Sequence, residues 1–157
     1  MRVGLGYDIH RVATGRRLVL GGVEIEEAFG LEGHSDADVV IHALMDALLG
    51  AAGQRDIGTY FPAGDKAYQG ISSLMLLQKV REIITNMQYR VVNVDIVLVA
   101  ERPRIAPFVD AMRERMSEVL GVDVSQIGLK ATTNEQVGAE GRGEAMSAQA
   151  VALLQHM

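Results

Sequence analysis

The chemistry-bearing residues of this chain begin with an aspartate and a histidine in the segment "GYDIHR". Asp8 and His10 are two positions apart, and on a β-strand such residues point to the same side. His42 lies in a later segment with helical periodicity. Taken alone, Asp8 and His10 also fit the polar edge of an ordinary strand. Taken alone, His42 also fits a core or surface histidine whose ring nitrogens are hydrogen-bonded. Together, one carboxylate and two imidazoles are typical of a catalytic zinc site, whose fourth position stays open.

Two further acids repeat at a spacing of four around His42. Asp38 and Asp46 therefore share its helical face, where a core-facing stripe would be apolar. We expect Asp38 and Asp46 to contact the metal ligands without binding the metal themselves, with Asp46 orienting the imidazole of His42. The alternative for Asp46 is an ordinary solvated acid. The chain has no cysteine, so His, Asp and Glu are the only strong ligand types available.

A second polar cluster is the segment "KATTNEQVG". Thr132, Thr133 and Glu135 leave the end of a predicted strand together, and hydroxyls, backbone N–H groups and one carboxylate suit a phosphate with a hard cation such as Mg²⁺. An Asn/Gly turn is the alternative. In "GHSDAD", His34 and Ser35 stand before a predicted helix, where an anion could bind or a helix cap could form.

Composition excludes several classes of protein. The 157 residues predict a single domain over 1–157, and a net charge of −5 without any basic block argues against nucleic-acid binding. No apolar run approaches the roughly 20 residues of a membrane helix. The N-terminal segment is too short and polar for a signal peptide. We expect a cytoplasmic protein without a membrane partner.

Hydrophobic periodicity predicts an α+β fold with helices on one face of a sheet. Strands are expected over residues 2–9, 17–25, 90–101 and 126–133, and helices over 36–50 (or to 53), 72–87 and 108–121. The first two strands are expected to form a hairpin, with Gly21-Gly22 marking a bulge or a close backbone approach. The tail 144–157 fits a strand or a helix, and we favour a strand. The polar segment 54–70 is long for a connecting loop, which favours a functional role.

The segments "GYDIHR", "GHSDADVVIHALMDALLGAAGQRDIGTYFP" and "KATTNEQVGAEGRGE" closely resemble the 2-C-methyl-D-erythritol 2,4-cyclodiphosphate synthase family of the non-mevalonate isoprenoid pathway. The resemblance runs along nearly the whole chain. It implies a homotrimer with a mostly four-stranded sheet, a strand at the C-terminus, and active sites at subunit interfaces. It also implies a lyase that cyclises 4-diphosphocytidyl-2-C-methyl-D-erythritol 2-phosphate and releases CMP.

The resemblance assigns roles to individual residues. Asp8, His10 and His42 would bind Zn²⁺, and Glu135 would bind Mg²⁺ or Mn²⁺. The transition state would be stabilised by His34 and Thr133, and a phosphate contacted by Ser35. The methylerythritol segment would comprise Asp56, Ile57 and Gly58, with Phe61, Pro62, Ala63, Gly64 and Asp65 close by. The cytidine pocket, from the neighbouring subunit, would comprise Ala100, Glu101, Arg102, Pro103, Arg104, Ile105, Ala106, Ala131, Thr132 and Thr133. Arg142 would contact phosphate or lie at the trimer axis.

Four positions depart from the family pattern, of which Asn134 and Gln136 vary the loop that keeps Thr132, Thr133 and Glu135. Arg104 stands where a lysine is frequent, which preserves a phosphate contact. Ala139 stands where phenylalanine is common, which leaves open any binding of a prenyl diphosphate in the central cavity of the trimer. Two other functions compete with cyclisation: a zinc-dependent phosphoester hydrolase with Asp46 or Glu135 as base, and a ligand-binding trimer without turnover.

Overall fold

A mixed five-stranded sheet forms the centre of the computed structural model, which describes residues 1–157. The strands follow one another in the order β4-β1-β7-β5-β6. Their bounds are β1 (Arg2–Thr14), β4 (Phe29–Leu31), β5 (Tyr89–Val99), β6 (Ile127–Thr132) and β7 (Ala145–His156). The sheet therefore has one strand more than the four expected, because the three-residue β4 pairs with β1 as an edge strand.

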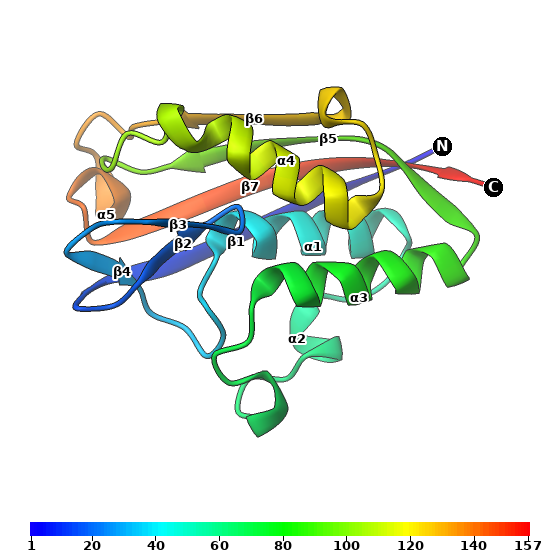
Figure 1. Cartoon of the computed structure of the whole chain (residues 1–157), viewed down its shortest axis with the longest axis horizontal. Coiled ribbons are helices and arrows are strands. Elements are labelled where there is room, and N and C mark those ends of the chain that lie inside the picture. The colour runs from blue at the N-terminus through cyan, green and yellow to red at the C-terminus, as the bar shows by residue number, and fades with distance from the viewer.

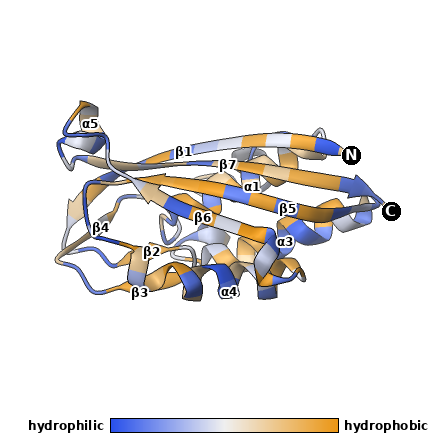
Figure 2. Ribbon diagram, turned by 90° about the horizontal axis from the view of Figure 1, so that it is seen from above, coloured by the Kyte–Doolittle hydropathy of each residue, from blue (hydrophilic) through white to orange (hydrophobic).

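Helices cover one face of this sheet. The long helices are α1 (Val39–Ala51), α3 (Ser73–Asn86) and α4 (Val109–Leu120), and the short ones are α2 (Ile57–Tyr60), α5 (Gly138–Gly141) and the 3₁₀ turns Lys66–Tyr68, Ala106–Phe108 and Val124–Gln126. Figure 1 shows α1 and α4 along the sheet with α3 beside them, and Figure 2 shows the long strands side by side with these helices behind them. The α+β class and the three long helices predicted from periodicity are confirmed. None of the helices combines the length and the apolar character that crossing a membrane requires.

The predicted pairing of the first strand was wrong. β1 pairs antiparallel with β7, from Arg2 opposite Leu154 to Arg11 opposite Ala145, rather than with residues 17–25. Those residues instead form their own hairpin of β2 (Leu18–Leu20) and β3 (Val23–Ile25). Strand partners some 140 residues apart leave no local signal. The tail is a strand, as we favoured.

Glycines 21 and 22 make the turn of that hairpin. Both have positive φ, 58° and 76°, which fits the two-residue turn in which glycine is preferred. A Cβ added at Gly21 would lie 2.7 Å from Cβ of Met112, and one at Gly22 would lie 2.5 Å from the Leu74 side chain. The expected close backbone approach is confirmed, and it is an approach to helices α3 and α4.

Helix α1 lies directly against the backbone of β1. A Cβ at Gly4 would come within 2.0 Å of the carbonyl oxygen of Ala47, and one at Gly6 within 1.9 Å of that of Ala43. These glycines share the strand face of Asp8. The helix consequently runs so close to the strand that His42, beside Ala43, is brought to the level of Asp8.

Helix ends are set by specific residues. Asp38 is the N-cap of α1 and its side chain accepts the N–H of Ile41 at 3.1 Å. Ser72 is the N-cap of α3, without a side-chain cap bond. Gly121 ends α4 in the left-handed conformation at φ 67°, the usual helix-terminating geometry. All three boundaries lie within a few residues of those the sequence predicts.

The sheet face away from the helices is apolar and exposed along β1. Val3 and Leu5 are each 69% exposed, Tyr7 is 52% exposed and Ile9 is 43% exposed. Val151 on the adjacent strand β7 is also 43% exposed. A row of large apolar side chains on one open face is typical of a surface that another protein chain covers.

Candidate metal centre and active site

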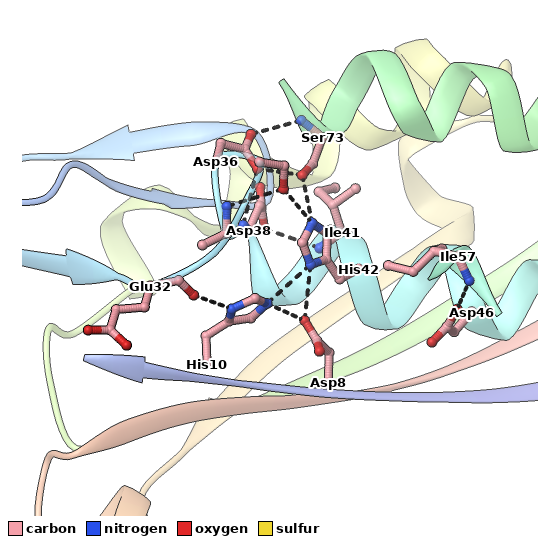
Figure 3. Close-up of polar contacts among 12 residues, drawn as sticks. Asp8, His10, Glu32, Asp36, Asp38, Ile41, His42, Asp46, Ile57 and Ser73 are labelled. Carbon is pink, nitrogen blue, oxygen red and sulfur yellow. Dashed lines mark hydrogen bonds and ion pairs between the residues drawn. The ribbon is translucent and has the colours of Figure 1, made fainter. Parts of the chain in front are cut away.

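Asp8, His10 and His42 meet between β1 and the first turn of α1 (Figure 3). Oδ2 of Asp8 lies 2.7 Å from Nε2 of His10 and 3.1 Å from Nδ1 of His42. The two ring nitrogens are 3.2 Å apart. The three atoms thus converge on one point, with His42 buried and the other two residues partly exposed.

The donor set fits a zinc ion. Ligand atoms about 2.0–2.2 Å from one tetrahedral zinc lie roughly 3.4 Å from one another, and the three atoms here are 2.7–3.2 Å apart. One carboxylate and two imidazoles with partial exposure leave a fourth position facing solvent. The sequence also lacks cysteine, which removes the thiolate ligands of other metal classes.

Asp8 and His10 shift each other's pKa. Burial alone would raise the pKa of Asp8, but its hydrogen bonds and ion pairs with His10 and His42 outweigh burial and lower it. Burial alone would lower the pKa of His10, but the hydrogen bond and charge of Asp8 outweigh it and raise that pKa. The site therefore holds an anionic carboxylate that attracts a cation, whether a proton or a metal.

Each ring is held by its second nitrogen. Nδ1 of His10 donates to the carbonyl oxygen of Glu32 at 2.5 Å. Nε2 of His42 lies 3.0 Å from Oγ of Ser73 and 3.2 Å from Oγ of Ser35. Hydrogen bonds of this kind fix the orientation of metal-binding imidazoles.

Asp46 does not play the role predicted for it. Its carboxylate accepts the backbone N–H of Ile57 at 2.8 Å, while His42 is oriented by Ser73. Burial raises the pKa of Asp46. Asp46 therefore ties helix α1 to the start of α2, and the spacing of four residues placed it on the correct face without identifying its partner.

Asp38 is fully buried and clamps the β2–β3 turn to α1. Its carboxylate accepts the N–H groups of Gly21 at 2.9 Å and Gly22 at 2.7 Å, besides that of Ile41. Burial and the nearby charge of Asp36 raise the pKa of Asp38 to about 6, against these three bonds. It supports the site by fixing the start of the helix that carries His42.

The loop predicted to contact methylerythritol, residues 56–65, is connected to the metal cluster. Asp56 caps α2 by accepting the N–H of Thr59 at 3.1 Å. His34 is joined to the later part of this loop, because its Nε2 lies 2.9 Å from the carbonyl oxygen of Asp65. Ser35, next to His34, contacts His42. Loop and cluster are thus connected through His34 and Ser35.

The predicted cytidine pocket coincides with a cavity of about 400 Å³ at the ends of the parallel strands β5 and β6. It is lined by Ala100, Glu101, Pro103, Arg104, Ile105, Ala106, Val109, Lys130, Ala131, Thr132 and Thr133. Arg102 is not among them, since its guanidinium lies 5.3 Å from the ring centre of Phe29. A cavity of this size suits a small ligand such as a nucleoside.

The loop after β6 is tied to the same cavity. The N–H of Glu135 donates to Oγ1 of Thr133 at 3.3 Å, and that of Gln136 to Glu101 at 3.0 Å. Glu135 has a positive φ of 51°. Arg142, at the end of α5, forms an ion pair of 2.9 Å with Glu144.

Within one chain, the metal cluster and this cavity are separated by packed core. Asp8 is level with Ala148 of β7, which is level with Leu98 of β5, a distance of about 10 Å for two strand spacings. Ala148 and Leu98 are completely buried. A ligand of one chain cannot pass between the two places through its interior.

Sequence reasoning missed Ser73, Asp36 and Glu32. Their roles depend on contacts made 22 to 37 residues away in the chain. The only signal in the sequence is that Ser73 and Asp36 stand at the starts of predicted helices, where serine and aspartate are common capping residues.

The fold and the cluster together describe an α+β protein with a candidate metal site of one aspartate and two histidines on β1 and α1. The chain belongs to the YgbB family, whose model matches residues 1–155.

Its relatives carry a specific name. It is 60% identical over 154 residues to 2-C-methyl-D-erythritol 2,4-cyclodiphosphate synthase of Symbiobacterium thermophilum, covering 98% of each chain. Among solved structures, it is similar to IspF of Plasmodium falciparum in complex with CDP (36% identity, TM-score 0.87, 99% of this chain and 96% of that one). It also matches the bifunctional IspDF of Campylobacter jejuni (36% identity, TM-score 0.96), covering 99% of this chain but only 42% of that longer protein.

Proposed function

We propose that this chain catalyses the cyclisation of 4-diphosphocytidyl-2-C-methyl-D-erythritol 2-phosphate to 2-C-methyl-D-erythritol 2,4-cyclodiphosphate. It is a lyase of isoprenoid precursor biosynthesis. The observation that carries the proposal is the Asp-His-His cluster in a chain 60% identical, over its whole length, to a synthase of that name. A cytoplasmic location is part of the proposal and rests on the sequence alone.

The proposed reaction needs no water. An oxygen of the 2-phosphate forms a bond to the β-phosphorus, and the bond from that phosphorus to the bridging oxygen breaks. CMP leaves with the bridging oxygen. Both reacting groups belong to one substrate, so the chain has to hold them close and in line.

The proposed ligands of the metals are Asp8, His10 and His42 for zinc, and Glu135 for magnesium or manganese. When bound, these ions would neutralise the phosphate charges and polarise the phosphorus–oxygen bonds. A chain of net charge −5 requires such cations to bind so anionic a substrate.

The side chains of the protein would position the remaining parts of the substrate. Ser35, beside the cluster, would donate to the phosphate, and His34 and Thr133 would stabilise the charge that develops on phosphate oxygens. Residues 56–58 and 61–65 would hold the methylerythritol. The cavity between residues 100–106 and 131–133 would hold the cytidine, which agrees with the CDP named in the complex of the Plasmodium relative.

We infer that the chain is a homotrimer with its active sites between subunits. The metal cluster and the cytidine cavity of one chain are separated by buried core, so one substrate would contact the cluster of one subunit and the cavity of its neighbour. The exposed apolar row of Val3, Leu5, Tyr7 and Ile9 on the open sheet face supplies the surface that subunits would bury against one another.

A product assay in ¹⁸O-labelled water tests the proposal. Purified protein, the cytidyl substrate and Mg²⁺ should give the cyclic diphosphate and CMP by phosphorus NMR, without ¹⁸O in either. A linear product, with ¹⁸O in that product or in CMP, would instead establish the zinc-dependent hydrolase. No turnover with zinc and Mg²⁺ present would favour the ligand-binding trimer. Loss of product on zinc chelation, and its return on adding zinc, completes the test.

A further inference from the structure

We propose that Ser73 and Asp36 are positioning residues that keep the single ring hydrogen of neutral His42 on Nε2, so that Nδ1 is free to bind metal. The proposal deepens the proposed function, since it concerns the proposed zinc ligand His42. Figure 3 shows the chain of contacts from Asp36 through Ser73 to His42 and Asp8.

The carboxylate of Asp36 acts only as an acceptor. Oδ2 accepts the backbone N–H of Ser73 at 2.8 Å, and Oδ1 accepts that of Asp38 at 3.1 Å. The hydroxyl of Ser73 makes a further, short hydrogen bond to Oδ1. An ionised carboxylate cannot donate, so the one hydroxyl hydrogen of Ser73 must point toward Asp36.

Ser73 can then act toward His42 only as an acceptor. Its Oγ lies 3.0 Å from Nε2 of His42, and with its own hydrogen used it requires that Nε2 carry the ring hydrogen. Ser73 is completely buried, so water does not compete for this bond. The direction of the bond is thus fixed by the charge of Asp36.

A competing acceptor lies on the other side of the ring. Oδ2 of Asp8 is 3.1 Å from Nδ1 of His42, and it would draw the ring hydrogen to Nδ1 if nothing opposed it. A hydrogen at Nδ1 would occupy the lone pair that a metal needs. Ser73, held by Asp36, opposes this transfer. Ser35 also contacts Nε2, at 3.2 Å, but no carboxylate holds its hydroxyl.

The tautomer of His10 is also fixed, but by a backbone group. Its Nδ1 donates to the backbone carbonyl of Glu32, an acceptor that no side-chain substitution removes, which frees Nε2 for the cluster. The two imidazoles are therefore fixed in opposite tautomers, and only that of His42 depends on side chains that can be replaced.

The test is Ser73→Ala, read by ¹⁵N NMR of the imidazoles in metal-free protein at alkaline pH, and by zinc affinity in competition with a chelator. In the wild type, His42 should be mainly in the Nε2–H form. Ser73→Ala should shift the hydrogen toward Nδ1 and weaken zinc binding by about 10–100-fold, the range for loss of a group that supports a metal ligand.

Three further variants separate positioning from folding. Ser117→Ala removes another buried serine hydroxyl, which donates within α4 to the carbonyl of Glu114, and should change neither readout. Ser73→Thr keeps the hydroxyl and should retain the wild-type tautomer. Asp36→Asn cannot accept from all three donors, so it should give mixed tautomers and weaker zinc binding even with Ser73 in place.

Two results would overturn the inference: His42 of the wild type mainly in the Nδ1–H form, or Ser73→Ala with unchanged tautomer and unchanged zinc affinity. Other results would refute the proposed function. A wild type that binds no zinc, or binds it and forms no cyclic product, would remove that function, while the tautomer of metal-free His42 would still decide the role of Ser73.

Discussion

At the scale of single residues, Asp8 contributes the only negative charge among the three proposed zinc ligands. Asp8→Asn preserves its size but removes that charge. We expect zinc affinity to fall by more than about 100-fold, beyond the usual loss for a supporting partner, and cyclisation to fall to background. Asp110→Asn, which changes an exposed carboxylate on α4, should alter neither. Calorimetric zinc titration and the product assay measure both, and zinc binding retained by Asp8→Asn would exclude Asp8 as a ligand.

The pKa of His10 predicts how zinc binding depends on pH. Asp8 raises that pKa above 6.5, and a protonated imidazole has no lone pair for metal. Zinc affinity should therefore fall as the pH is lowered through the raised pKa, by up to about tenfold per pH unit. Asp8 stays ionised there, because its own pKa lies below 3.8. Titrations at several pH values check this, and an affinity independent of pH from about 7.5 to 5.5 would contradict it.

Metal-free stability should change in the opposite direction. A raised pKa means that folding favours the protonated His10, so its contribution is complete below the unfolded pKa of about 6.5 and is lost as the pH rises through the folded value. Lowering the pH toward 6.5 should thus strengthen this part of the free energy of unfolding while it weakens zinc binding.

Residue spacing was sufficient to predict that Asp8 and His10 share a side and that His42 lies on a helix. It could not identify the partner of His42, because Ser73 is 31 residues away and reaches His42 only once α3 packs beside α1. Asp46 was assigned that role on spacing alone, and its actual partner, Ile57, starts another helix.

At the scale of elements, the contact of α1 with β1 determines whether the cluster forms. Gly6→Ala would place a Cβ 1.9 Å from the carbonyl oxygen of Ala43. Because this contact is backbone, we expect a loss of about 3 kcal/mol in the free energy of unfolding and weaker zinc binding. Gly50→Ala is the matched control: its Cβ would meet only Leu5 O, at 3.8 Å, and it should stabilise α1 by about 0.5–1 kcal/mol.

Urea unfolding of both glycine variants measures these changes. A Gly6→Ala protein as stable as the wild type would show that α1 can move away from β1 without cost.

Helices were predicted more reliably than strand pairing, for a physical reason. The bounds of α3 and α4 follow from local periodicity, from Ser72 and from Gly121. The partner of β1 is at the other end of the chain, and the importance of Gly4 and Gly6 appears only when a helix approaches them. Local patterns contain neither fact.

At the scale of the whole molecule, the open face of the sheet is expected to hold the trimer together. Leu5→Glu places a charge among the exposed apolar residues of β1, and we expect it to dissociate the trimer and abolish cyclisation while zinc still binds. Met75→Glu changes an apolar side chain 56% exposed on α3, and should leave the trimer intact. Sedimentation velocity distinguishes the two, and a trimeric Leu5→Glu would place the interface elsewhere.

The proposed sharing of active sites between subunits could not be derived from spacing or composition. Sequence blocks indicated a cytidine pocket near residues 100–106 and 131–133, and the structure contains a cavity there. The proposal that the cavity serves the metal cluster of a neighbouring subunit rests on the family resemblance and on the buried core between the two places in one chain.

The proposed catalytic centre combines the metal cluster of one subunit with the cavity of another. Activity in mixed trimers tests this arrangement. Asp8→Ala disables the cluster, and Ala106→Trp fills the cavity with a side chain from an exposed position. Each variant alone should be inactive. Trimers that contain both, co-expressed with different tags and purified through each tag, have one intact centre of three, so we predict about one third of wild-type cyclisation. Mixed trimers as inactive as the single variants would contradict a shared centre.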